Sequence, residues 1–168
     1  MSSDRLHLSL STVEDLANEC GRFHDFPFHL GAQSYDTAQR TWTGYFIRGS
    51  ADPSRVVTTR RPWLVKVTEF PIIETAVAIR HVTEAEIQDR AQIGVYTFRQ
   101  VHRTATGCRF EFHQDCDIYI DIDGPFEAEI RDVRELTRAR GRITSLGFLD
   151  FGIEVRDVSP PSGTGRLT

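Results

Sequence analysis

Apolar and polar residues alternate with a period of two over most of this chain, which is the pattern of a half-buried β-strand. The clearest case is DIYIDID at 117–123, where three isoleucines occupy one side and acidic residues and a tyrosine the other. Similar segments lie at 24–30, 41–48, 72–82, 93–103, 108–114, 126–133 and 148–156. Short turn-forming stretches separate many of them, so the sequence predicts an antiparallel meander of hairpins.

One helix is expected near the N-terminus, over residues 12–20. The Ser, Thr and acidic residues at its start have capping-box spacing, and the apolar residues after them recur at helical spacing. Thr83 and Glu86 repeat the capping spacing and predict a second, short helical segment that ends near residue 90. WLVKV at 63–67 is expected to be a strand that ends at Pro71.

The length of 168 residues fits one domain, and 39% hydrophobic with 26% charged residues is the composition of a folded protein. We therefore expect a mainly β (α+β) fold. In it, one N-terminal helix precedes about eight or nine strands in a curled sheet, a barrel or a two-layer sandwich. Residues 1–158 would form a single β-rich domain, and the breaker-rich segment 159–168 a disordered tail.

Charge and cysteine usage narrow the class of partner and the compartment. The formal net charge of −4 argues against nucleic acid as a partner. No apolar run approaches the roughly 18 residues of a membrane span, and the N-terminus lacks the apolar core of a secretory signal. Cys20, Cys108 and Cys116 are an odd number without metal-type spacing. These features predict a cytoplasmic protein that binds no membrane; an exposed sheet edge would permit a homodimer.

Acidic residues are concentrated between Glu111 and Glu135, where nine stand against two arginines. If 117–123 and 126–133 pair as a hairpin across Gly124, like charges lie opposite each other, which is destabilising without a cationic partner. The candidate partner-binding residues are Asp117, Tyr119, Asp121, Asp123, Glu127 and Glu129. The arginines that could neutralise this face from within the chain are Arg134, Arg138, Arg140 and Arg142.

Catalytic and metal-binding motifs are weak in this chain. The D-x-D-G pattern that ends at Gly124 is similar to the phosphatase signature of haloacid-dehalogenase-like enzymes, but Pro125 stands where that signature has threonine. A zinc ion at His24 or His29 would need partners from another strand. Those partners could be His113, Asp115 or Cys116. A metal-dependent hydrolase built on His113, Asp115 and Asp117 is therefore a third-ranked hypothesis, and no cofactor is expected.

Aromatic residues are expected to point inward from many of the strands. They are Phe26, Phe28, Trp42, Phe46, Phe98, Phe110, Phe112 and Phe126. They either fill the hydrophobic core or line a cavity, which would make the protein a small-ligand carrier in a β-barrel.

The stretch GRFHDFPFH at 21–29 joins the predicted helix to the first aromatic strand, and His24 and Asp25 are expected to form a structural corner there. The helix, the GRFHD entry and the aromatic strands that follow resemble a group of small bacterial β-rich domains. Some of these are assigned as immunity-type proteins of polymorphic toxin systems. GIEVRD at 152–157 would be their last strand, although Pro27 and the longer loops after 48 and 83 depart from the pattern.

The resemblance implies binding rather than catalysis. The first hypothesis is therefore a non-catalytic, cytoplasmic binding protein, and the resemblance implies that it is of the immunity type. Its acidic hairpin, at about 117–131, would bind a basic protein partner.

Overall fold

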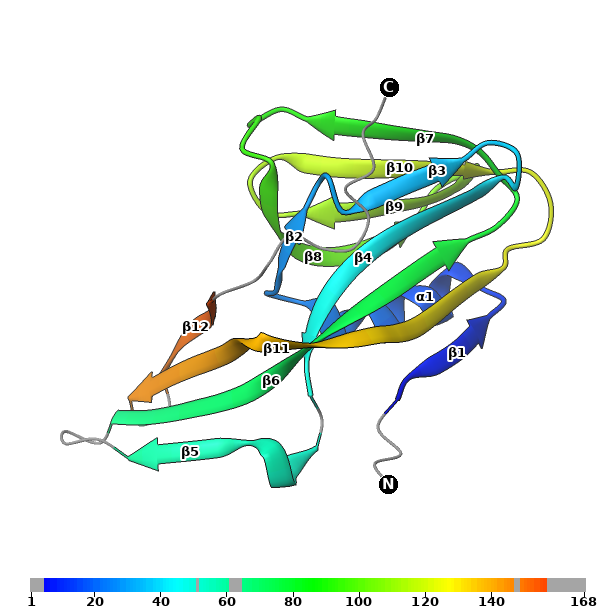
Figure 1. Ribbon diagram of the computed structural model, residues 1–168. Helices are drawn as coiled ribbons and strands as arrows, with labels where there is room; N and C mark the ends of the chain where they lie inside the picture. Colours follow the sequence, from blue (N-terminus) through cyan, green and yellow to red (C-terminus); the bar gives the residue numbers. More distant parts are fainter. Residues whose placement is uncertain (1–4, 51, 61–64, 147–148, 157–168) are drawn as a thin grey trace.

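The computed structural model describes residues 5–50, 52–60, 65–146 and 149–156 (Figure 1). The elements in chain order are β1 (His7–Leu10), α1 (Val13–Cys20), the 3₁₀ helix η1 (Gly21–Phe23), β2 (Pro27–His29), β3 (Gln33–Asp36), β4 (Thr41–Gly49), the 3₁₀ helix η2 (Pro53–Arg55), β5 (Val57–Arg60), β6 (Val65–Ile79), β7 (Val82–Asp89), β8 (Val95–Arg103), β9 (Gly107–Phe112), β10 (Cys116–Ile122), β11 (Ala128–Leu146) and β12 (Leu149–Arg156). The predicted tail at 159–168 lies outside the described residues.

The strands form two antiparallel sheets. The first has the order β1-β11-β6-β4-β3, with β5 paired to β6 and β12 to β11; the second has the order β2-β8-β9-β10-β7. One sheet is curled into a half-barrel. The mainly β class with one N-terminal helix is thus confirmed. In Figure 1, β6 and β11 extend as a long ribbon away from the second sheet and carry β5 and β12 at their far end.

The main hydrophobic core is built from both sheets and α1. Phe28, Trp42, Phe46, Phe98 and Phe110 are nearly or fully inaccessible to solvent, as the alternation predicts. Phe112 is also buried, and Phe126 packs against the same cluster from a half-buried position. A second, smaller cluster lies beneath the ribbon of β6 and β11. It contains Phe26, Ile47, Phe70, Ile72 and Leu136.

The predicted N-terminal helix is confirmed as α1. The hydroxyl of Thr12 accepts a hydrogen bond from the backbone N–H of Asp15 at 3.1 Å, which satisfies one free donor of the first turn. The buried side of the helix presents Val13, Leu16 and Cys20 to the core. Because α1 packs against β8 and β1, it covers one side of the space between the sheets.

The second predicted helix is wrong, because residues 82–89 form strand β7. Thr83 does not cap a helix there. Its hydroxyl donates to the backbone oxygen of Asp121 in the neighbouring strand at 3.2 Å. The spacing of Thr83 and Glu86 therefore has no capping role, because both residues lie on a strand.

Strand β6 continues through Pro71, so the two strands predicted around this proline are one. Pro71 lies opposite Arg140, next to a register shift in β11 between Glu135 and Arg140. A proline has no N–H to donate, and an irregularity in the partner strand tolerates that loss. The carbonyl of Pro71 still accepts a hydrogen bond from the N–H of Ser50 at 2.9 Å.

Candidate functional site

The predicted acidic hairpin does not form, because β10 and β11 belong to different sheets. β10 pairs with β9 and β7, whereas β11 pairs with β1 and β6. Gly124, with a φ of 123°, lies in the connection that carries the chain from one sheet to the other. Alternation shows which side of a strand is polar but not which strand lies beside it, and this is why the hairpin prediction is wrong.

Three of the six predicted partner-binding residues share one face of the second sheet. Asp117, Tyr119 and Asp121 alternate with buried isoleucines on β10. Across the β10–β7 ladder, Asp121 lies opposite Glu84, Tyr119 opposite Glu86, and Asp117 opposite Gln88. Directly opposite residues in an antiparallel pair point to the same face. We call Glu84, Glu86, Asp117, Tyr119 and Asp121 the acidic face. Sequence reasoning missed the two glutamates, because it took residues 83–90 for a helix.

Arg109 borders the acidic face from strand β9, opposite Tyr119. Its Nε is 3.9 Å from Oδ1 of Asp117, which is too long for a hydrogen bond. A side-chain hydrogen bond with Tyr119 is the main cause that raises the pKa of Arg109. Both Nε of Arg109 and Oδ1 of Asp117 are buried and make no hydrogen bond with the described part of the chain. One arginine therefore offsets only part of the charge of four carboxylates.

Glu111 lies on the same border of the acidic face as Arg109, opposite Asp117, and is fully engaged by β8. Its Oε2 accepts from Nε2 of Gln100 at 2.9 Å and lies 2.5 Å from Nε2 of His102, while Oε1 accepts from Arg99 at 2.9 Å. The hydrogen bonds from Gln100 and His102 lower the pKa of Glu111 to about 2. Glu111 therefore stabilises the pairing of β8 with β9 and is less available to a partner.

The lowered pKa of Glu111 predicts a loss of stability in acid. An ionised carboxylate that is held only in the folded state stabilises it above the usual pKa of 4.5, and this contribution disappears as the pH falls towards 2. A Glu111→Gln variant should lose roughly 3 kcal/mol of unfolding free energy at pH 7. Urea titrations between pH 2 and 7 should show this difference shrinking on acidification. The exposed Glu84→Gln is the control, and a pH-independent difference for Glu111→Gln would contradict the prediction.

The remaining predicted partner-binding residues lie outside the β7–β10 ladder and are paired locally. Glu129 is on β11, and Asp123 and Glu127 are in the connection before it. Their ion-pair partners are Arg40 for Asp123, Arg80 and His81 for Glu127, and His7 and Arg131 for Glu129, at 3.2–3.9 Å. Of the arginines expected to neutralise the hairpin, Arg134 instead donates to the buried Glu74 at 2.7 Å. The side chains of Arg138 and Arg140 lie outside the described set.

The inward aromatic rings pack against one another. Phe46 contacts four other rings, with centroid distances of 4.7 Å to Phe28, 5.0 Å to Phe23, 5.5 Å to Phe98 and 5.8 Å to Phe110. These are the separations of directly touching aromatic pairs. The rings therefore fill the space between the sheets, which disfavours the hypothesis of a ligand carrier with an aromatic-lined cavity.

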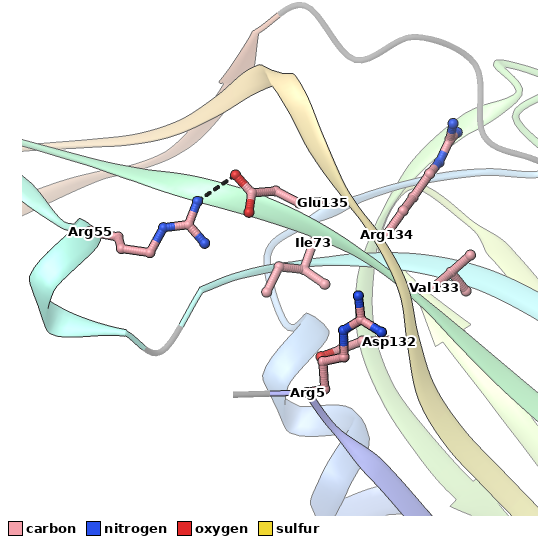
Figure 2. A pocket seen from close by; sticks show the side chains of 7 residues that line it. All are labelled: Arg5, Arg55, Ile73, Asp132, Val133, Arg134 and Glu135. Atoms are coloured by element: carbon pink, nitrogen blue, oxygen red, sulfur yellow. Dashed lines mark hydrogen bonds and ion pairs between the residues drawn. The ribbon is translucent and has the colours of Figure 1, made fainter. Parts of the chain in front are cut away.

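A surface pocket of about 170 Å³ lies beside an irregularity of β11, and Figure 2 shows the side chains that line it. They are Arg5, Arg55, Ile73, Asp132, Val133, Arg134 and Glu135. Arg55 donates to Glu135 at 2.6 Å across one side of the pocket (Figure 2). Asp132 at its floor is 6% exposed and accepts from the buried Arg48 at 2.7 Å. Most of the charged groups here are thus engaged in holding the strands together.

The predicted corner at His24 and Asp25 meets a third residue, His113. One potential ligand atom of each side chain lies within 4.8 Å of the other two. Asp115 and Asp117, which were expected to join His113 in a metal site, are not members of this group. His24 and His113 are far apart in the sequence, so no local motif could reveal that they meet.

No family model matches this sequence, and neither a curated protein nor a solved structure was found that matches it. Within the described ranges, the helices are too short or too polar to cross a bilayer. The function is therefore inferred from the chemistry of the surface itself.

Proposed function

We propose that this protein is a non-catalytic binding protein whose acidic face recognises a basic surface on a protein partner. The observation that supports this proposal is the placement of four carboxylates on the adjacent strands β7 and β10. Neighbouring strands are about 4.8 Å apart, and same-face residues along a strand about 7 Å apart. At these separations the four carboxylates repel one another in the free protein, and a cationic partner relieves that repulsion.

The acidic face is held on strands rather than on loops, which favours specific recognition. Asp117, Tyr119 and Asp121 are fixed by ladders on both sides, to β9 and to β7. Tyr119 at the centre combines an aromatic ring with a hydroxyl, a combination that is enriched in protein interfaces. Little conformational entropy would be lost when such a surface binds.

The resemblance of the N-terminal third to immunity-type domains supports one specific form of the proposal. In that form the partner is a toxin with a basic cleft, such as a nuclease, and the acidic face covers the cleft. The carboxylates then take the place of an anionic substrate, and charge steering accelerates the encounter.

Reversing two charges of the acidic face tests this proposal directly. A fluorescein-labelled nona-arginine peptide serves as the cationic probe, with fluorescence anisotropy measured at low salt. The double variant Glu84→Lys/Glu86→Lys should weaken binding at least about tenfold, because like charges then face the probe. Binding to the unmodified protein should also weaken as salt is added, since exposed charges are screened.

The matched control is Glu127→Lys/Glu129→Lys, which changes the net charge by the same amount on a different surface. This control should weaken binding by less than about threefold. Equal weakening by the two double variants would mean that the probe senses net charge alone, and the proposal would then be wrong.

A further inference from the structure

Two histidines and an aspartate converge where two turns meet at the end of the second sheet. His24 and Asp25 lie between η1 and β2, and His113 follows β9. Nδ1 of His24 is 3.0 Å from Oδ2 of Asp25, and the imidazole rings of His24 and His113 are 6.4 Å apart at 85°. The three side chains each offer a ligand atom within 4.8 Å of the other two.

The backbone holds Asp25 and His113 against the same short stretch of β8. The N–H of Asp25 donates to the carbonyl of Phe98 at 3.1 Å, and the N–H of His113 donates to the carbonyl of Thr97 at 2.9 Å. Adjacent residues of one strand therefore fix the two turns relative to each other. Only side-chain rotations are needed to change the separation of the ligand atoms.

Both turns use backbone conformations that aim these side chains. Asp25 has a φ of 67°, in the left-handed region that costs most residues about 1–2 kcal/mol but that Asp and Asn tolerate. Gln114 and Asp115 have φ values of 66° and 59° in the three-residue turn that connects the paired residues Phe112 and Cys116. This turn ends β9 abruptly and leaves His113 beside the corner at Asp25.

Two imidazole nitrogens and one carboxylate oxygen form a donor set that suits zinc. Zinc bonds of about 2.0–2.2 Å place tetrahedral ligand atoms roughly 3.4 Å apart, so the widest separation, at most 4.8 Å, must shrink by up to about 1.4 Å. The side chains of His24 and Asp25 are 51% and 54% exposed, which gives them room to rotate. The three cysteines are buried thiols and do not compete from the surface.

We propose that His24, Asp25 and His113 bind one Zn²⁺ ion, with the remaining coordination position open to water. Three protein ligands and one open position are the arrangement of zinc sites that take a further ligand. The zinc site is separate from the acidic face, and its test does not depend on the proposed binding function.

Titration calorimetry with ZnCl₂ on the full chain, in the presence of a phosphine reductant, tests this site. The unmodified protein should bind one zinc ion per chain in a saturable manner. Asp25→Asn and His113→Gln should each weaken binding at least tenfold, because each removes one of three ligands. Asparagine tolerates the left-handed backbone at position 25, so Asp25→Asn should keep the fold. The control His29→Gln changes a histidine of the same segment outside the group and should bind zinc normally.

Histidine side-chain NMR of the unmodified protein gives a second readout that needs no variant. Zinc should shift the imidazole resonances of His24 and His113 and leave those of His29 unchanged. Absence of saturable binding, equal affinity in all four proteins, or zinc shifts confined to other histidines would each overturn the site.

Discussion

Replacing Asp132 with alanine should lower the free energy of unfolding by about 3–5 kcal/mol, one of the two largest effects expected for a single substitution in this protein. The carboxylate accepts from Nε and Nη2 of Arg48 at 3.2 and 2.7 Å and from the hydroxyl of Thr75 at 2.8 Å. It also accepts from the N–H of Leu6 at 2.8 Å. Asp132 thus ties β11 to β4, to β6 and to the segment before β1, and its loss leaves buried donors without an acceptor.

Chemical denaturation monitored by circular dichroism measures the effect of Asp132→Ala. The control is Glu127→Ala, which removes a carboxylate that is 49% exposed and paired with Arg80 and His81 at the surface. Exposed ion pairs contribute about 0–1 kcal/mol, so the control should remain close to the unmodified protein. Similar losses of unfolding free energy for the two variants would show that burial of the hydrogen bonds to Asp132 does not increase stability.

Replacing Phe46 with alanine should also cost about 3–5 kcal/mol. Phe46 is 1% exposed, and its ring is in contact with rings from η1, β2, β8 and β9. Alanine would leave a cavity where these elements meet, and neighbouring rings held by several strands cannot close it fully.

The same denaturation experiment measures Phe46→Ala, with Phe46→Leu as an intermediate case that fills more of the cavity. Val57→Ala on β5 is the control, because Val57 is 59% exposed and its truncation should cost less than about 0.5 kcal/mol. A loss below 1 kcal/mol for Phe46→Ala would mean that the aromatic cluster repacks around the missing ring, and the prediction would be wrong.

Much of the fold could be predicted from the sequence because burial imposes a local period. Cys108, Phe110, Ile118 and Ile120 are buried, as alternation predicts, and α1 begins at the capping threonine. The register of each strand pair, and which strands pair with each other, produce no such local pattern in the sequence. The stretch around Gly124 reads as a hairpin turn, yet it carries the chain between sheets, because the main core requires Ile130 opposite Val77 rather than beside β10.

The candidate sites were less predictable than the fold, for two physical reasons. The acidic face needs Glu84 and Glu86 beside Asp121 and Tyr119, and that proximity depends on the long-range pairing of β7 with β10. The proposed zinc ligands meet because two turns both bond to β8, which no spacing in the sequence can show. The sequence could indicate which residues are candidates for a site, but it could not indicate which residues lie beside them in the fold.

The order of strands along the chain also has a consequence for how the protein folds. Strands β7 to β10 occupy one continuous segment, residues 82–122, and pair among themselves, whereas β6 and β11 lie on either side of that segment. Contacts between residues close in sequence cost less loop-closure entropy than contacts between distant ones. We expect the four-strand segment to form first and to draw its two ends together. The long β6–β11 ladder would then close as the slow step, so the surface proposed to bind a partner would form before this ladder does.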